Sequence, residues 1–143
     1  MPRRPIIPNG YSILIADDEI NVARTLQMIF EHDGYNVTCV HSAAEALKKF
    51  NEGLRADIVV ADLNMERDDI GLDVARAAQK LDPRPLVVIC TGYANVDNSR
   101  MALQMRIDYL ATKPVDVDDM KAALGLLLER RRRSLQTSVL SHG

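Results

Sequence analysis

The sequence predicts a single α/β domain built around a parallel sheet, and two observations carry that prediction. Five short apolar runs with the character of strands alternate with five segments of helical periodicity. Two of the runs, residues 58–61 and 86–90, are apolar at every position. Strands that are covered on both faces have this composition, as they do in parallel sheets. A chain of 143 residues is also long enough to bury one such core.

The elements follow one another in a regular order. Ser42 and Glu45 form a capping box for the second helix, and Asp116 can cap the fifth. Gly34 and Gly53 can end the first and second helices in a left-handed conformation. The strand runs are residues 11–16, 37–40, 58–61, 86–90 and a weaker run at 109–111. Five strand–helix units with right-handed crossovers suggest a flavodoxin-like (βα)5 sandwich with the strand order 2-1-3-4-5.

The ends of the chain differ from its centre. Residues 1–10 are expected to be a flexible N-terminal extension, and residues 11–129 form the predicted domain. Residues 130–143 are expected to be a basic C-terminal tail or the start of a linker, although Leu135 and the apolar residues after it could continue the last helix. No secretory signal or membrane-spanning run is recognised. The net charge of −2 gives no strong attraction to nucleic acid or an anionic membrane.

Polar residues follow four of the strand runs, where ligands bind in sheets of this kind. Asp17 and Asp18 follow the first, Asp62 the third, Thr91 the fourth and Lys113 the fifth. Each has an ordinary explanation on its own, such as an acidic helix start, a turn residue or a surface lysine. Their joint occurrence at one predicted edge of the sheet is harder to ascribe to chance. The edge is therefore a candidate functional site.

The chemistry of these groups is specific. Three neighbouring carboxylates repel one another unless a cation joins them, and hard oxygen ligands suit Mg²⁺. A carboxylate beside Mg²⁺ can attack a phosphoryl group, and a lysine ammonium can neutralise charge on the transferring oxygens. Asp62 stands between the other groups, which makes it the predicted nucleophile. The cysteines Cys39 and Cys90 form no disulfide framework and favour a reducing, cytoplasmic compartment.

The segments ILIADDE, VVADLNM, VICTGYA and YLATKPV resemble the response-regulator receiver family over residues 12–128. The resemblance implies that Asp62 is the phosphoacceptor and that Asp17 and Asp18 bind Mg²⁺. It also implies that the backbone carbonyl of Asn64 is a further metal ligand. Thr91 and Lys113 would then contact the phosphoryl oxygens. The peptide bond between Lys113 and Pro114 is expected to be cis, as in the family.

Two positions depart from the family pattern. The segment after Asp62 is lengthened before Gly71, and its acidic residues Glu66, Asp68 and Asp69 could alter metal affinity or partner choice, or simply face solvent. The usual aromatic switch residue three positions before the lysine is replaced by Leu110. Its neighbour Tyr109 would point to the opposite face of the sheet and could not replace it. The usual coupling between the switch threonine and an aromatic residue is therefore in question.

The resemblance implies a phosphorylation-dependent switch of a two-component system or phosphorelay. A sensor histidine kinase or phosphotransfer protein would supply the phosphoryl group, and the domain would catalyse only its own aspartyl phosphorylation and dephosphorylation. A downstream protein would bind the face formed by the fourth helix, fifth strand and fifth helix. No nucleic acid or membrane partner is expected, and a homodimer is an option. The alternatives are a receiver-fold docking module that is not phosphorylated, a phosphatase, which would need an aspartate where Asn64 stands, and a flavin binder.

Overall fold

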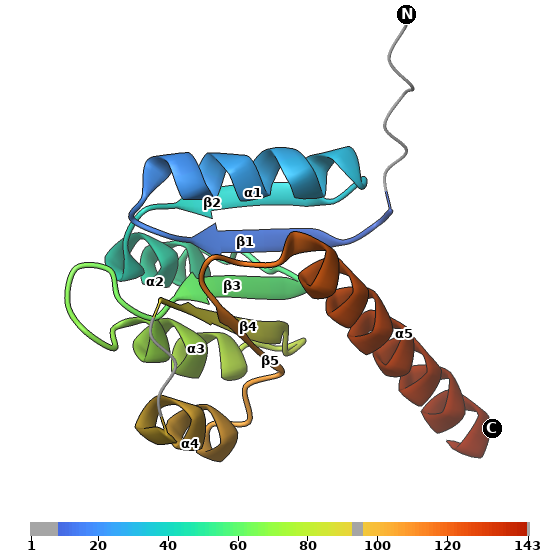
Figure 1. Cartoon of the computed structure of the whole chain (residues 1–143). Coiled ribbons are helices and arrows are strands. Elements are labelled where there is room, and N and C mark those ends of the chain that lie inside the picture. Colours follow the sequence, from blue (N-terminus) through green and yellow to red (C-terminus); the bar gives the residue numbers. More distant parts are fainter. Residues whose placement is uncertain (1–8, 93–95, 143) are drawn as a thin grey trace, which may run out of the picture.

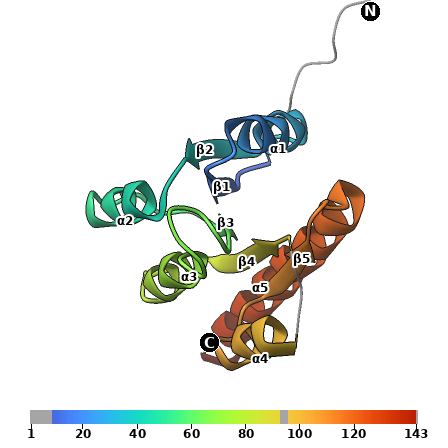
Figure 2. The ribbon, with the colours of Figure 1, turned by 60° about the vertical axis from the view of Figure 1, so that its left-hand side comes forward.

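The chain folds into a five-stranded parallel sheet with helices on both faces (Figures 1 and 2). The computed structural model describes residues 9–92 and 96–142, so most of the expected N-terminal extension lies outside the described residues. The strand order β2-β1-β3-β4-β5 confirms the sequence prediction. The elements are β1 (Ser12–Ala16), α1 (Ile20–His32), β2 (Asn36–Val40), α2 (Ala43–Asn51), β3 (Ile58–Asp62), α3 (Gly71–Gln79), β4 (Leu86–Thr91), α4 (Val96–Gln104), β5 (Tyr109–Thr112) and α5 (Val117–His142).

The central strands are buried on both faces, which explains their continuous apolar composition. Alternate residues of β1, β3 and β4 point to opposite faces, so Val60 contacts the core beneath α1 and α5, whereas Val59 contacts the core beneath α2 and α3. Both valines are almost fully buried. Parallel strands with helices on both sides therefore account for the runs in which polar residues are absent.

Helix ends follow the signals in the sequence. The Ser42 hydroxyl accepts a hydrogen bond from the main-chain N–H of Glu45 at 3.0 Å, and the Asp116 carboxylate accepts one from Asp119 at 3.0 Å. Gly34 and Gly53 have φ values of 94° and 99°, as a left-handed helix terminus requires. These local features fix the points at which the chain enters and leaves the sheet.

Neighbouring residues of β5 point to opposite faces of the sheet, as expected. Tyr109 packs against the core under α1 and α5, while Leu110 packs against the core on the opposite face. The prediction that Tyr109 cannot occupy the place of Leu110 is confirmed.

Helix α5 continues through the basic segment and ends at His142. Its first half is anchored in the core by Met120, Leu124 and Leu128, and its second half extends past the sheet (Figure 1). Leu126 and Leu135 are exposed on this helix. Of the alternatives left open by the sequence, continued helix is the one observed for residues 130–142. Among the described helices, none has the length and apolar character needed to cross a membrane.

Candidate functional site

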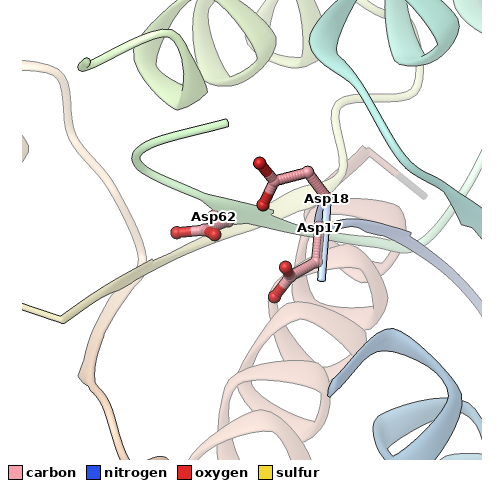
Figure 3. Close-up of side chains that lie close together, drawn as sticks. All are labelled: Asp17, Asp18 and Asp62. Atoms are coloured by element: carbon pink, nitrogen blue, oxygen red, sulfur yellow. The ribbon is translucent and has the colours of Figure 1, made fainter. Parts of the chain in front are cut away.

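Three carboxylates lie together where β1 and β3 end (Figure 3). Asp62 is the last residue of β3, while Asp17 and Asp18 directly follow β1, which is the neighbour of β3 in the sheet. One oxygen from each of the three carboxylates lies within 4.8 Å of the others. Asp17 and Asp62 are 3% and 6% exposed, whereas Asp18 is exposed to solvent. The structure thus gathers the acidic residues that the sequence placed at one edge.

Lys113 joins this cluster from the end of β5, at the same edge of the sheet. Its Nζ lies 3.1 Å from Oδ2 of Asp62, 3.4 Å from Oδ2 of Asp17 and 3.8 Å from Oε1 of Glu19. The main-chain N–H of Lys113 donates to the carbonyl of Thr91 at 2.7 Å, which fixes the lysine at the end of β4. The peptide bond between Lys113 and Pro114 is cis, as predicted. A single ammonium therefore bridges two buried carboxylates.

The electrostatics of the cluster follow from burial and from this ammonium. Burial raises the pKa of Asp62, the hydrogen bond and charge of Lys113 offset that increase only in part, and the charge of Asp17 adds to it. Burial alone would lower the pKa of Lys113, but the hydrogen bond and charge of Asp62, with the charge of Asp17, raise it instead. The lysine is thus held in its charged form. Ionisation of Asp62 in the folded chain, by contrast, is less favourable than in water unless a further cation is bound.

The donor set fits a small divalent cation. The three clustered side chains offer only carboxylate oxygens, which are the ligands preferred by Mg²⁺. One ammonium cannot balance three carboxylates, so the cluster retains excess negative charge when all three are ionised. Two of the carboxylates are buried, where such an excess is unfavourable. A divalent cation would remove this imbalance.

Two further predicted site residues lie at the same edge. Thr91 is the last residue of β4 and is completely buried. Asn64 is exposed, two residues beyond Asp62, and its main-chain N–H donates to Oδ1 of Asp62 at 3.4 Å. The side-chain oxygen of Asn64 accepts a hydrogen bond from Asp69 at 2.8 Å. Its side chain is therefore engaged within the loop, and its proposed role concerns the backbone carbonyl.

Two residues shape the site through contacts that the sequence does not predict. A Cβ atom built on Gly71 would overlap the carbonyl oxygen of Asp62 and lie 2.7 Å from Cα of Leu63, so only glycine fits at the start of α3. Glu66 accepts hydrogen bonds from the main-chain N–H groups of Ala43 and Ala44, at 2.8 and 3.4 Å. The sequence offers no signal for either contact. The Gly71 contact depends on how closely two backbone segments approach, and the Glu66 contact joins residues that are distant along the chain.

Asp62→Asn is expected to raise the free energy of unfolding at neutral pH when divalent cations are absent. The pKa of Asp62 lies above its usual value of 3.8 in the folded chain, so the folded state binds this proton more tightly than the unfolded state does. The stability gained from the proton is present below the unfolded pKa and is lost as the pH rises through the folded pKa. Urea unfolding with a chelator should show a small difference between variant and wild type at about pH 3 and the full difference at neutral pH.

A less stable Asp62→Asn variant at neutral pH would contradict this expectation. It would mean that the contact between Asp62 and Lys113 stabilises the fold by more than the burial of the carboxylate costs.

Comparisons with known proteins identify relatives of this chain. The family model described as response regulator receiver domain matches residues 13–125. The transcriptional regulatory proteins ZraR and GlrR of Escherichia coli K12 are 34% and 30% identical to the chain over 117 and 118 residues. These matches cover 81% and 82% of this chain but 26% of each relative, so the chain spans about a quarter of their length.

Solved structures show the same fold. A CheY-like response regulator receiver domain protein from Methanospirillum hungatei is 27% identical, with a TM-score of 0.79, and the match covers 87% of this chain and 98% of that one. The response regulator TrrA of Thermotoga maritima, solved in complex with Mg²⁺-BeF, is also 27% identical, with a TM-score of 0.70 and coverage of 82% and 98%.

Proposed function

Because this chain belongs to the response regulator receiver domain family, we propose that it accepts a phosphoryl group on Asp62. A receiver domain is a phosphorylation-dependent switch of two-component signalling. The observation that supports the assignment to Asp62 is its position: it ends a central strand, is 6% exposed, and lies beside two acidic residues and 3.1 Å from the Lys113 ammonium.

The proposed reaction is an in-line transfer from a phosphohistidine. An oxygen of the Asp62 carboxylate forms a bond to phosphorus while the bond between phosphorus and the imidazole nitrogen of the donor breaks. The electron pair leaves with that nitrogen, which then takes a proton from solvent. Lys113 lies 3.1 Å from the attacking carboxylate and is positioned to neutralise charge on the phosphoryl oxygens. The Thr91 hydroxyl, at the end of β4, would donate a hydrogen bond to one of them.

Asp17, Asp18 and Asp62, with the backbone carbonyl of Asn64, are the residues that would hold Mg²⁺. The support is the set of oxygen ligands within 4.8 Å of one another. When bound, the cation would supply neutralisation of the carboxylates and of the transferring oxygens. The carbonyl of Asn64 enters this ligand set through the resemblance to the family.

The proposal includes partners and a mode of output. A sensor histidine kinase or phosphotransfer protein is the donor, and a downstream protein binds the face formed by α4, β5 and α5 in a phosphorylation-dependent manner. The domain catalyses only its own phosphorylation and dephosphorylation. A cytoplasmic location is supported by the free cysteines Cys39 and Cys90.

The experiment that tests this function is intact-mass spectrometry after incubation with phosphoramidate, a small donor that contains a phosphorus–nitrogen bond. The expected result is the gain of one phosphoryl group in the presence of Mg²⁺ and no gain with a chelator. No gain by a folded chain with Mg²⁺ bound would contradict the proposal and favour the docking module that signals without phosphorylation.

A further inference from the structure

The β3–α3 loop, defined as residues 63–70, is held by hydrogen bonds at both ends, within the loop and to helix α2. Its ends are fixed because the Leu63 N–H donates to the carbonyl of Cys90 at 2.8 Å and the Gly71 N–H donates to the carbonyl of Leu63 at 2.8 Å. Within the loop, the main-chain N–H of Asp69 donates to the side-chain oxygen of Asn64. The middle of the loop is tied to a different element, because Glu66 accepts from the first two N–H groups of α2. The loop therefore has an ordered path although it faces solvent.

The contact between Glu66 and α2 is favourable for both partners. The first N–H groups of a helix have no partner within the helix, and the helix N-terminus attracts negative charge. Burial would raise the pKa of Glu66, but the hydrogen bonds from Ala43 and Ala44 and the charge of Arg67 lower it. Ser42 accepts from Glu45 at the same helix end, so two side chains cap α2 at different N–H groups. Only one of these two side chains, that of Glu66, belongs to the loop.

The loop begins at the proposed phosphorylation site. Asn64 lies two residues after Asp62 and two residues before Glu66. The Asn64 side chain accepts a hydrogen bond within the loop, which favours its backbone carbonyl, the ligand implied by the resemblance to the family. Leu63 is buried and Met65 packs against the core, so the backbone is anchored on both sides of Asn64. Residues 66–69 are exposed, and the contact of Glu66 with α2 holds this part of the loop together with the ion pair between Arg67 and Asp73. The Glu66 contact therefore adds to the restraint on the Asn64 carbonyl.

We infer that Glu66 is a positioning residue for the metal site, which holds the Asn64 backbone in place by tying the β3–α3 loop to α2 and thereby sets the affinity for Mg²⁺. The inference rests on the proposed function, since it assumes that Mg²⁺ binds the Asp17, Asp18 and Asp62 cluster. It also makes the N-terminus of α2 a structural neighbour of the phosphorylation site. Displacement of α2 would be transmitted to the metal through a single carboxylate.

The test compares two caps of the same helix. Glu66→Ala removes the cap that belongs to the loop, and Ser42→Ala removes the cap that does not touch the loop. Both variants should unfold at a lower temperature than wild type. Only Glu66→Ala should weaken Mg²⁺ binding, by about 10-fold, as is typical when a group that orients a metal ligand is lost. Glu66→Gln keeps one acceptor oxygen and should lose less affinity.

Isothermal titration of each folded variant with Mg²⁺ measures the affinity, and thermal unfolding without metal measures the capping effect. Equal Mg²⁺ affinity in wild type and Glu66→Ala would overturn the inference and leave the proposed function intact. An equal loss of affinity in Ser42→Ala would also overturn it, because the effect would then come from α2 alone. A wild-type chain that fails to bind Mg²⁺ would overturn both the inference and the proposed metal site.

Discussion

Lys113→Met is expected to slow phosphorylation from acetyl phosphate by about 100-fold or more at saturating Mg²⁺. The substitution keeps an unbranched side chain but removes the ammonium that lies 3.1 Å from Asp62 and 3.4 Å from Asp17. These two ion pairs hold the ammonium in place before the reaction, so it stabilises developing charge with little rearrangement. The initial rate of phosphorylation, followed by intact mass, measures the effect.

Lys121→Met is the matched control. Lys121 forms an ion pair with Asp33 at 3.0 Å on the surface, away from the carboxylate cluster, and its loss should leave the rate unchanged. Rates are compared well below the unfolding temperature, because Lys113→Met also leaves two buried carboxylates without their ammonium. A folded Lys113→Met variant that is phosphorylated as fast as wild type would contradict the role proposed for the lysine.

Gly71→Ala is expected to lower the free energy of unfolding by about 3 kcal/mol. The new Cβ would overlap the carbonyl oxygen of Asp62 and approach Cα of Leu63 to 2.7 Å. These are backbone atoms, so the strain cannot be relieved by turning a side chain. Either α3 moves away from β3 or the backbone at Asp62 shifts. Urea unfolding at neutral pH measures the loss of stability.

Gly125→Ala provides the opposite expectation in the same assay. Gly125 lies inside α5, and a Cβ built on it meets nothing within 4 Å. Alanine there should raise the free energy of unfolding by about 0.5–1 kcal/mol, because glycine is the poorer helix former. Gly71→Ala as stable as wild type would show that α3 can move away from β3 without cost.

The sheet and the cluster could be predicted because their signals are local. Strand runs such as 86–90 are apolar at every position, and caps such as Ser42 lie within a few residues of the N–H groups they bind. Once the strand order was predicted, the position of Asp62 and Lys113 at the ends of strands brought them to one edge. Periodicity and topology together were sufficient for this part of the site.

The remaining features depend on tertiary contacts that leave no pattern in the sequence. Glu66 is read from the sequence as one of several acidic loop residues, and only the fold shows that it alone among Glu66, Asp68 and Asp69 caps α2. Gly71 looks like an ordinary helix start until its distance to the Asp62 backbone is known. The continuation of α5 to His142 was one of several alternatives, because the arginine-rich segment suits a helix and a tail equally.

The most direct test of the central claim is to locate the phosphoryl group on the chain. Borohydride reduction of the phosphorylated protein converts an aspartyl phosphate to homoserine, and peptide mass spectrometry then identifies the converted position. The account predicts conversion at Asp62 alone, dependent on Mg²⁺, and no conversion in Asp62→Asn. Conversion at Asp17 or Asp18 instead, or unchanged labelling of the Asp62→Asn variant, would contradict it.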